Sequence, residues 1–175
     1  ITSNEDSPFE MCVLDHDFDE DTDTGHIPAY SELHNGKIEV LSVDDDPVNQ
    51  MVIEGLLVPQ GYVVTPAMDG DTALAMLEER KYLPDIVLLD CQMPNKTGFE
   101  VCTELRRKYP ETLPVIMISA NTDEDNILKG FRAGSNDYVK KPFSRAEVLA
   151  RIRTQLKLRD MCRKVPAERK KKRGG

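Results

Sequence analysis

The stretch Ile86–Asp90, with the sequence IVLLD, decides the fold of this chain. Four apolar residues in a row, with no polar alternation, are typical of a strand that is buried on both faces at the centre of a parallel sheet. The run ends on an acid. An acid at the carboxyl end of such a strand points into the crevice where open α/β sheets bind ligands, so Asp90 is the first candidate for chemistry.

Two further polar signals follow predicted strands. Three aspartates at 44–46 follow the strand expected at 38–43, and Lys141 follows the short strand expected at 137–140. The carboxyl ends of parallel strands meet at one edge of a sheet. Carboxylate oxygens suit a hard divalent cation, and a lysine is a mobile point charge for a phosphoryl group. Together with Asp90, these residues indicate phosphorylation on aspartate.

Strand and helix patterns alternate from residue 37 onward. Pro66 lies inside the second strand, and because proline cannot donate to a ladder, that strand is expected at a sheet edge. Five strands alternating with five helices predict a doubly wound parallel sheet, an α/β fold. The strands are expected at 38–43, 62–67, 86–90, 115–119 and 137–140, and the helices from 47, at 71–81, 99–109 and 123–133, and from 144.

The first and last helices carry specific expectations. Asp46 is the predicted N-cap of the first helix and Pro47 opens its first turn. The last helix continues past Leu158 to Cys162, so it is expected to leave the domain as a longer helix. The residues of the first helix that share one face at helical spacing, and are expected to face the core, are Val48, Met51, Val52, Gly55 and Leu56.

The two ends of the chain differ in charge. Residues 1–36 carry ten Asp or Glu and no Lys or Arg, and they show no sustained period, which predicts a disordered acidic linker. Residues 37–158 are the predicted domain. Residues 159–175, with eight Lys or Arg against two acids, are the predicted helix extension and basic tail. A solvated tail is favoured, and a nuclear signal or a nucleic-acid or lipid contact stays open.

Composition limits the function classes only loosely. The formal net charge of −8 is unevenly placed and therefore says little about partners. Four scattered cysteines without a C-x-x-C spacing indicate free thiols in a reducing compartment. No apolar run is long enough to span a bilayer and no signal peptide is visible, so the expected location is cytoplasmic. The chain starts with Ile and not Met, so we expect a segment of a longer protein or a processed one.

Six signals in a fixed order resemble the receiver domain of two-component response regulators. The resemblance covers about Lys37 to Leu158 and implies a flavodoxin-like sheet with strand order 2-1-3-4-5. Any one signal alone is common, and the order makes the set specific. The signals are Val43-Asp44-Asp45-Asp46, Leu89-Asp90, Met93-Pro94 with Gly98, Ser119-Ala120, Tyr138, and Lys140-Lys141-Pro142-Phe143.

The resemblance assigns roles to the site residues. Asp90 is the implied phosphoacceptor, which takes a phosphoryl group from a histidine kinase or a histidine phosphotransfer protein. Asp44 and Asp45, with Asp90 and the backbone carbonyl of Gln92, are the implied Mg²⁺ ligands. Lys141 is expected to pair with Asp90 and then with the phosphoryl oxygens, and the peptide before the following proline resembles the cis bond of the family.

The resemblance also implies a switch. Ser119 is expected to turn its hydroxyl toward the phosphoryl group and Tyr138 to turn inward when it does, although a fixed core aromatic stays open for Tyr138. The expected output is the face of the fourth helix, fifth strand and fifth helix, which also offers a possible homodimer contact. We expect no direct nucleic-acid-binding domain. We expect a module of a larger sensor protein, such as a hybrid histidine kinase or a receiver-linked cyclase, that turns over no external substrate.

Two other classes compete with this interpretation. A haloacid dehalogenase-like phosphohydrolase also uses an aspartate nucleophile, Mg²⁺ and a lysine, but its nucleophile lies on the first strand, whereas the nucleophile candidate here, Asp90, lies on the third strand. A degenerate receiver that serves only as a docking surface is the second alternative. Every chemical position is filled, which argues against it.

Overall fold

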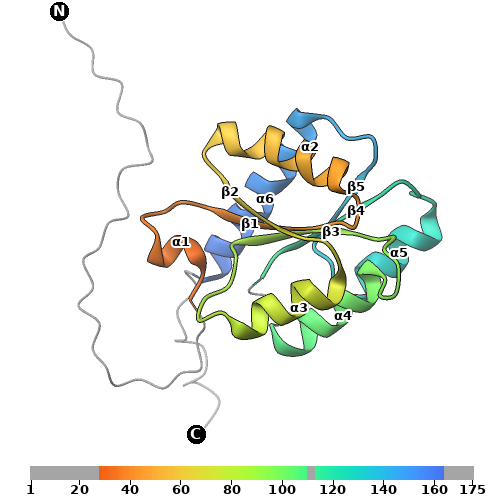
Figure 1. Ribbon diagram of the computed structural model, residues 1–175, viewed down its shortest axis with the longest axis horizontal. Helices are drawn as coiled ribbons and strands as arrows, with labels where there is room; N and C mark the ends of the chain where they lie inside the picture. Colours follow the sequence, from red (N-terminus) through yellow and green to blue (C-terminus); the bar gives the residue numbers. More distant parts are fainter. Residues whose placement is uncertain (1–27, 110–112, 164–175) are drawn as a thin grey trace, which may run out of the picture.

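The structure, a computed structural model, describes residues 28–109 and 113–163. It is built around one sheet with helices on both sides (Figure 1). The strands are β1 (Glu39–Val43), β2 (Val63–Ala67), β3 (Ile86–Asp90), β4 (Val115–Ser119) and β5 (Asp137–Lys140). The helices are α1 (Tyr30–Leu33), α2 (Pro47–Leu57), the 3₁₀ turn η1 (Val58–Gln60), α3 (Gly70–Glu79), α4 (Gly98–Lys108), α5 (Glu124–Arg132) and α6 (Arg145–Arg163).

The sheet is parallel throughout and its order is β2-β1-β3-β4-β5. This confirms the predicted doubly wound fold and strand order. Strand β2 lies at an edge, where Pro66 pairs in register with Ser42 without having to donate to an outer neighbour. The helix count differs from the prediction, because α1 adds to the five expected helices within the described residues.

Helices cover both faces of the sheet and explain the unbroken apolar strands. Helices α2 and α6 lie over one face, and α3, α4 and α5 over the other (Figure 1). Neighbouring residues of one strand enter different halves of the core: Leu41 packs with the α3 and α4 side, and Val40 with the α2 and α6 side. A strand buried on both faces has no solvent side on which polar residues would alternate.

The predicted inner face of α2 is wrong for Val48, Met51, Val52 and Gly55, which are exposed, whereas Leu56 is partly buried against the core. Val48 is 62% exposed and Met51 71% exposed, whereas Ile53 and Leu57 are buried. The rotation of the helix is set by a polar residue: the Gln50 side-chain amide lies 3.0–3.1 Å from the carbonyl oxygens of Ser42, Asp44 and Ala67. A buried amide must be paired, so this contact turns the more hydrophobic stripe outward.

The segment before β1 belongs to the folded unit, although residues up to 36 were expected to be disordered linker. Ala29 bridges to Leu83, and the backbone N–H of Tyr30 donates to the Leu83 carbonyl at 2.7 Å. The rings of Tyr30 and His34 stack at 3.7 Å against the edge of Tyr82. These contacts join segments that are far apart in the sequence, so no local hydrophobic period predicts them. Residues 1–27 lie outside the described part.

Helix α6 runs to Arg163, which confirms the expected extension beyond Leu158. Its last turns are anchored, because buried Arg159 donates to Asp85 at 2.8 Å beneath the sheet. The basic run that follows lies outside the described residues. Within the described ranges, no helix has both the length and the apolar character that crossing a bilayer requires. Cys91, Cys102 and Cys162 are free thiols there, as predicted.

Candidate functional site

The strand order brings together three side chains that are far apart in sequence. Strands β1 and β3 are neighbours in register, with Val43 opposite Leu89, so Asp44 and Asp90 leave the same edge side by side. Lys141 follows β5. Its ammonium group donates to Asp44 Oδ2 and to Asp90 Oδ1, both at 2.9 Å. The lysine thus bridges two buried carboxylates, as the crevice argument predicts.

The third carboxylate at this edge belongs to Asp45. Oxygen atoms of Asp44, Asp45 and Asp90 lie within 4.8 Å of one another. Asp45 is exposed and the other two are buried, so the cluster opens to solvent on one side. Three carboxylates against one ammonium leave two negative charges together, and the all-oxygen donor set is the one Mg²⁺ prefers. The residues therefore fit a hard divalent cation.

Burial and neighbouring charges shift the pKa values of Asp90 and Lys141. Burial raises the pKa of the Asp90 carboxyl above its ordinary value, and the nearby charges of Asp44 and Asp45 add to that, while the hydrogen bond from Lys141 opposes it. Burial by itself lowers the pKa of Lys141, but its bonds to Asp90 and Asp44 outweigh that effect and the pKa is raised. Lys141 therefore keeps its positive charge at neutral pH.

Asp46 and Asn49 support the site without belonging to the carboxylate cluster. Asp46 caps α2, as predicted, because its carboxylate accepts the Val48 N–H at 2.8 Å. The other oxygen of Asp44 accepts from the Asp46 N–H at 2.9 Å and from the Asn49 side-chain amide at 3.2 Å. Sequence reasoning missed Asn49. The only sequence signal for Asn49 is its position, as a polar residue in the first turn of the helix that follows the acidic triplet.

The loop after β3 returns the chain to α4 at very close range. A Cβ on Gly98 would lie 2.1 Å from the Asp90 carbonyl oxygen, so only glycine fits there. The Gly98 N–H donates to the Cys91 carbonyl at 3.1 Å, which closes the loop. This explains the glycine of the Met93-Pro94 motif. Gln92 is exposed on this loop beside Asp90, and the ligand role of its carbonyl stays a prediction.

Ser119 and Tyr138 lie one strand further along. Ser119 ends β4, whose residue Ile118 pairs with Asp90, so its buried side chain is next to the acidic edge. The Ser119 hydroxyl oxygen accepts from the Asn121 N–H at 3.1 Å. Tyr138 is buried, and its hydroxyl donates to the Asn121 carbonyl at 2.9 Å. The Lys141–Pro142 peptide is cis, as the resemblance implies.

The Cys91 thiol lies beside the hydroxyl of Tyr138. Cys91 Sγ lies 3.7 Å from the Tyr138 hydroxyl. Burial raises the pKa of the Cys91 thiol to about 11 and that of the Tyr138 phenol to about 12, so both keep their protons at neutral pH. The Cys91 thiol can therefore donate a hydrogen bond to the Tyr138 hydroxyl oxygen, and the Tyr138 hydroxyl donates to the Asn121 carbonyl.

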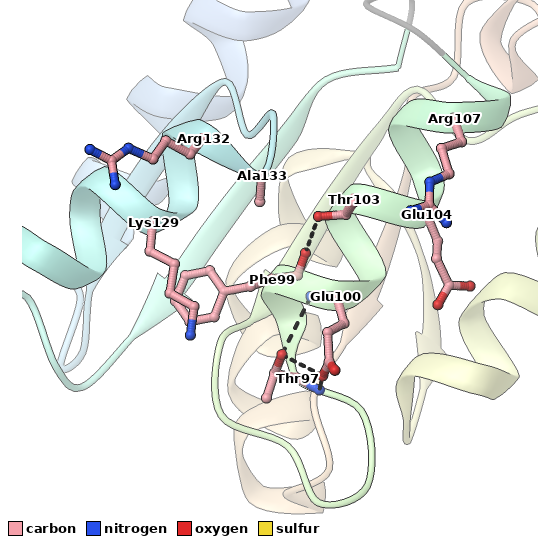
Figure 2. Close-up of a pocket in the computed structure, with 9 residues that line it drawn as sticks. All are labelled: Thr97, Phe99, Glu100, Thr103, Glu104, Arg107, Lys129, Arg132 and Ala133. Carbon is pink, nitrogen blue, oxygen red and sulfur yellow. Dashed lines mark hydrogen bonds between the residues drawn. The ribbon is translucent and has the colours of Figure 1, made fainter.

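A separate groove of about 640 Å³ lies between α4 and α5 (Figure 2). Lys129 lies 4.6 Å over the ring of Phe99 on its wall. Thr97 and Glu100 exchange the two hydrogen bonds of a capping box, and Glu104 is paired with Lys96. No residue of the acidic cluster lines this groove, and its acids are already engaged. Among the described residues, the carboxylate cluster that fits a cation therefore lies at the carboxyl edge of the sheet and not in this groove.

The chain belongs to the response regulator receiver domain family, whose sequence model matches residues 40–153. Receiver domains are the signalling phosphoacceptors of two-component systems. The fold, the acidic edge and the bridging lysine described above are what this membership leads one to expect.

Solved structures agree with this membership. The receiver domain of a sensor histidine kinase from Pseudomonas aeruginosa PAO1, described with a magnesium ion coordinated in the active site cleft, is 36% identical. It aligns with a TM-score of 0.63 over 69% of this chain and 98% of its own. The receiver domain of a Francisella response regulator is 33% identical, with a TM-score of 0.64 over 70% and 98%. A CheY-like receiver protein from Methanospirillum hungatei JF-1 shares the fold at 24% identity, with a TM-score of 0.67 over 71% and 98%.

Proposed function

We propose that Asp90 accepts a phosphoryl group from a phosphohistidine of a histidine kinase or histidine phosphotransfer protein. The observation that carries this proposal is the Lys141 ammonium group, which bridges Asp44 and Asp90 at 2.9 Å in an acidic cluster at the carboxyl edge. An Asp90 oxygen forms the new bond to phosphorus while the bond from phosphorus to the imidazole nitrogen breaks. The imidazole keeps the electron pair and takes up a proton.

Asp44, Asp45, Asp90 and the Gln92 carbonyl are the residues that would hold Mg²⁺. A bound Mg²⁺ supplies charge neutralisation for the phosphoryl oxygens. Lys141 stabilises the same oxygens once the carboxylate it pairs with has become an acyl phosphate. The proposal is supported by two features of the cluster, its excess of negative charge and its opening to solvent beside Asp45.

Ser119 is proposed to donate its hydroxyl proton to the phosphoryl group on Asp90. Its oxygen accepts from the Asn121 N–H, a bond that does not use the hydroxyl proton of Ser119. The response then reaches the face of α5, β5 and α6, where Leu128 and Phe131 are exposed. That face is the proposed contact for an output partner or for a second copy of the chain.

The phosphodonor is proposed to dock on the exposed stripe of α2. Val48, Met51 and Val52 are exposed there on the first two turns, directly after the acidic triplet. Contiguous exposed apolar side chains next to a reactive site indicate a protein interaction surface. The similarity to a receiver domain from a sensor histidine kinase supports the further proposal that this domain is one module of a larger protein.

The test is the intact mass of the purified chain after incubation with acetyl phosphate. We expect one phosphoryl adduct that requires Mg²⁺ and disappears with a chelator. Asp90→Asn should give none, and Asp125→Asn, which changes an exposed acid on α5, should behave as the wild type. An adduct of equal yield on Asp90→Asn would contradict the proposal, and so would no adduct together with no binding of beryllofluoride.

A further inference from the structure

A second groove, of about 470 Å³, lies between the turn η1 and the first half of α6. Gln60 lines it on the side of η1. The residues of α6 that line it are Arg145, Ala146, Leu149, Ala150 and Arg153. Along the helix, the three apolar residues come between the two arginines. The groove therefore offers an apolar surface with a positive charge at each end.

The two arginines of this groove are free to bind an acid. Both are exposed, and neither forms an ion pair or a hydrogen bond with another described side chain. Arg151 of the same helix, by contrast, is paired with Asp137 at 2.9 Å. Within the described part of the chain, no Asp or Glu lines the groove. An anionic segment would therefore meet two unpaired cations and no like charge.

The groove between α4 and α5 is a poorer site for such a segment. Glu100 and Glu104 line it together with its basic residues (Figure 2). One of those basic residues, Lys129, already lies over the Phe99 ring. An acidic occupant would meet like charges there, which is unfavourable. Of the two grooves, the one on α6 is therefore the better match for an acidic ligand.

The chain itself carries a segment of matching chemistry. Residues 1–27 contain nine Asp or Glu and no Lys or Arg. Within them, residues 9–15 read FEMCVLD, five apolar residues with the acids Glu10 and Asp15. From Glu10 to Asp15 an extended chain spans up to about 17 Å, and from Arg145 to Arg153 a helix spans about 12 Å. Both acids can therefore reach the two arginines at once.

The segment is also long enough to reach the groove of its own domain. The chain enters the fold beside the far end of α6, because Ala29 bridges to Leu83 and Glu32 pairs with Arg163 in the last turn. The 19 residues of α6 extend about 28 Å from there. An extended chain from position 15 to position 28 spans up to about 43 Å. No second copy of the chain is needed to fill the groove.

We infer that residues 9–15 dock in the groove between η1 and α6 of the same chain. Glu10 and Asp15 pair with Arg145 and Arg153, and the apolar side chains between the acids pack on the apolar middle of the groove. The domain then presents this segment, and not two bare arginines, to a partner at this surface. Docking does not require phosphorylation of Asp90. Because the ion pairs lie at the surface, docking weakens as the salt concentration rises.

Paramagnetic broadening in the full chain locates the segment. A nitroxide is attached at Ser7→Cys, just before the segment, in a chain that also carries Cys12→Ala and Cys162→Ser. The two remaining cysteines are buried and do not take up the label. At low salt, we expect the amide signals of residues 146–153 to lose most of their intensity. At high salt they should recover it.

Charge reversal tests the ion pairs. Arg145→Glu combined with Arg153→Glu should abolish the broadening at residues 146–153. Adding Glu10→Arg and Asp15→Arg to that chain should restore it, because the same pairs then form with the charges exchanged. The amide spectrum of each variant shows that the chain is folded.

A matched control uses the other groove. Arg107→Glu combined with Arg132→Glu makes the same charge change on exposed arginines of α4 and α5. This variant should broaden residues 146–153 as much as the parent chain does. The control thereby separates docking at α6 from a general loss of positive charge.

Three results would overturn the inference. The first is a folded parent chain without broadening at residues 146–153. The second is broadening that survives reversal of both groove arginines, or that the exchanged charges do not restore. The third is equal broadening when an isotope-labelled chain without nitroxide is mixed with a nitroxide chain, because a second copy would then supply the segment. No phosphodonor is present in these samples, so a failure of the proposed phosphorylation cannot produce any of these results.

Discussion

The two ends of β3 carry aspartates with opposite surroundings. Asp85, directly before the strand, accepts from the Glu39 N–H at 2.9 Å, from Arg159 at 2.8 Å, and from both the N–H and the hydroxyl of Ser31. Asp90, at the other end, has one side-chain donor among the described residues, Lys141, and two further carboxylates beside it. Both acids are buried.

The difference separates an acid that holds the structure from an acid that we propose as the phosphoacceptor. At Asp85 every oxygen is paired, and the segment before β1 and the end of α6 are joined through it. At Asp90 the pairing is incomplete and its pKa is raised by burial. A buried acid without enough donors is unfavourable for the fold and available to a cation or a phosphoryl group. The following predictions test this contrast.

Asp85→Asn should have the largest effect on stability. It removes the buried partner of a hydrogen-bonded ion pair and leaves Arg159 with only the exposed Asp160, so the free energy of unfolding should fall by about 3–5 kcal/mol. Urea unfolding measures this. Asp160→Asn changes the exposed partner of the same arginine and should change the value by less than about 1 kcal/mol. Equal effects of the two variants would show that Asp85 is not the buried anchor.

Added Mg²⁺ should stabilise the wild type through the acidic edge. A ligand that binds only the folded state at about 100 times its Kd adds about 2.7 kcal/mol to the free energy of unfolding. Asp45→Asn should lose most of this gain, since Asp45 lies in the carboxylate cluster. Asp46→Asn should keep it, because that residue caps α2 and asparagine caps equally well. Identical Mg²⁺ responses of the two variants would place the ion elsewhere.

The pH dependence of stability should differ between the wild type and Asp90→Asn in metal-free buffer. The folded pKa of Asp90 is raised, so the carboxyl favours folding most below its ordinary value of 3.8, and that contribution is lost as the pH rises through the folded pKa. The stability of the wild type relative to Asp90→Asn should therefore decline across this range, by less than the Asp85→Asn effect. Denaturant unfolding at several pH values checks the sign, and a relative gain for the wild type would contradict it.

Arg163→Gln should have the smallest effect. Arg163 pairs with Glu32 near the protein surface, where an ion pair contributes between zero and about 1 kcal/mol. We expect the free energy of unfolding to fall within that range, and to fall less at high salt. A loss comparable with that of Asp85→Asn would mean that the contact between α1 and α6 depends on this surface ion pair and not on buried Asp85.

The place of Asp90 in the acidic cluster was predictable from sequence, and the hydrogen-bond partners of Asp85 were not. Asp90 follows an apolar run whose carboxyl tip faces the ligand crevice, and this local rule needs no distant partner. Asp85 precedes the same run, but Ser31 and Arg159, which define its role, lie 54 and 74 residues away. Both lie outside the predicted domain of 37–158, so no local pattern joined them to it.

Helix α2 shows why local periodicity fails in a particular way. Two stripes at helical spacing overlap on it, and the more hydrophobic one, with Val48 and Met51, is exposed. Sequence periodicity weighs apolar residues and does not register that the Gln50 amide has three backbone carbonyls to satisfy beneath the helix. In the site, Gly98 was found through its motif, whereas Asn49 required the tertiary contacts.

The most direct test of the contrast is the position of the phosphoryl group itself. Borohydride reduces an acyl phosphate on aspartate to homoserine, which peptide mass mapping then locates after treatment with acetyl phosphate and Mg²⁺. The account predicts homoserine at position 90 and an unmodified aspartate at position 85. Homoserine at any other acid, with residue 90 unmodified, would contradict it.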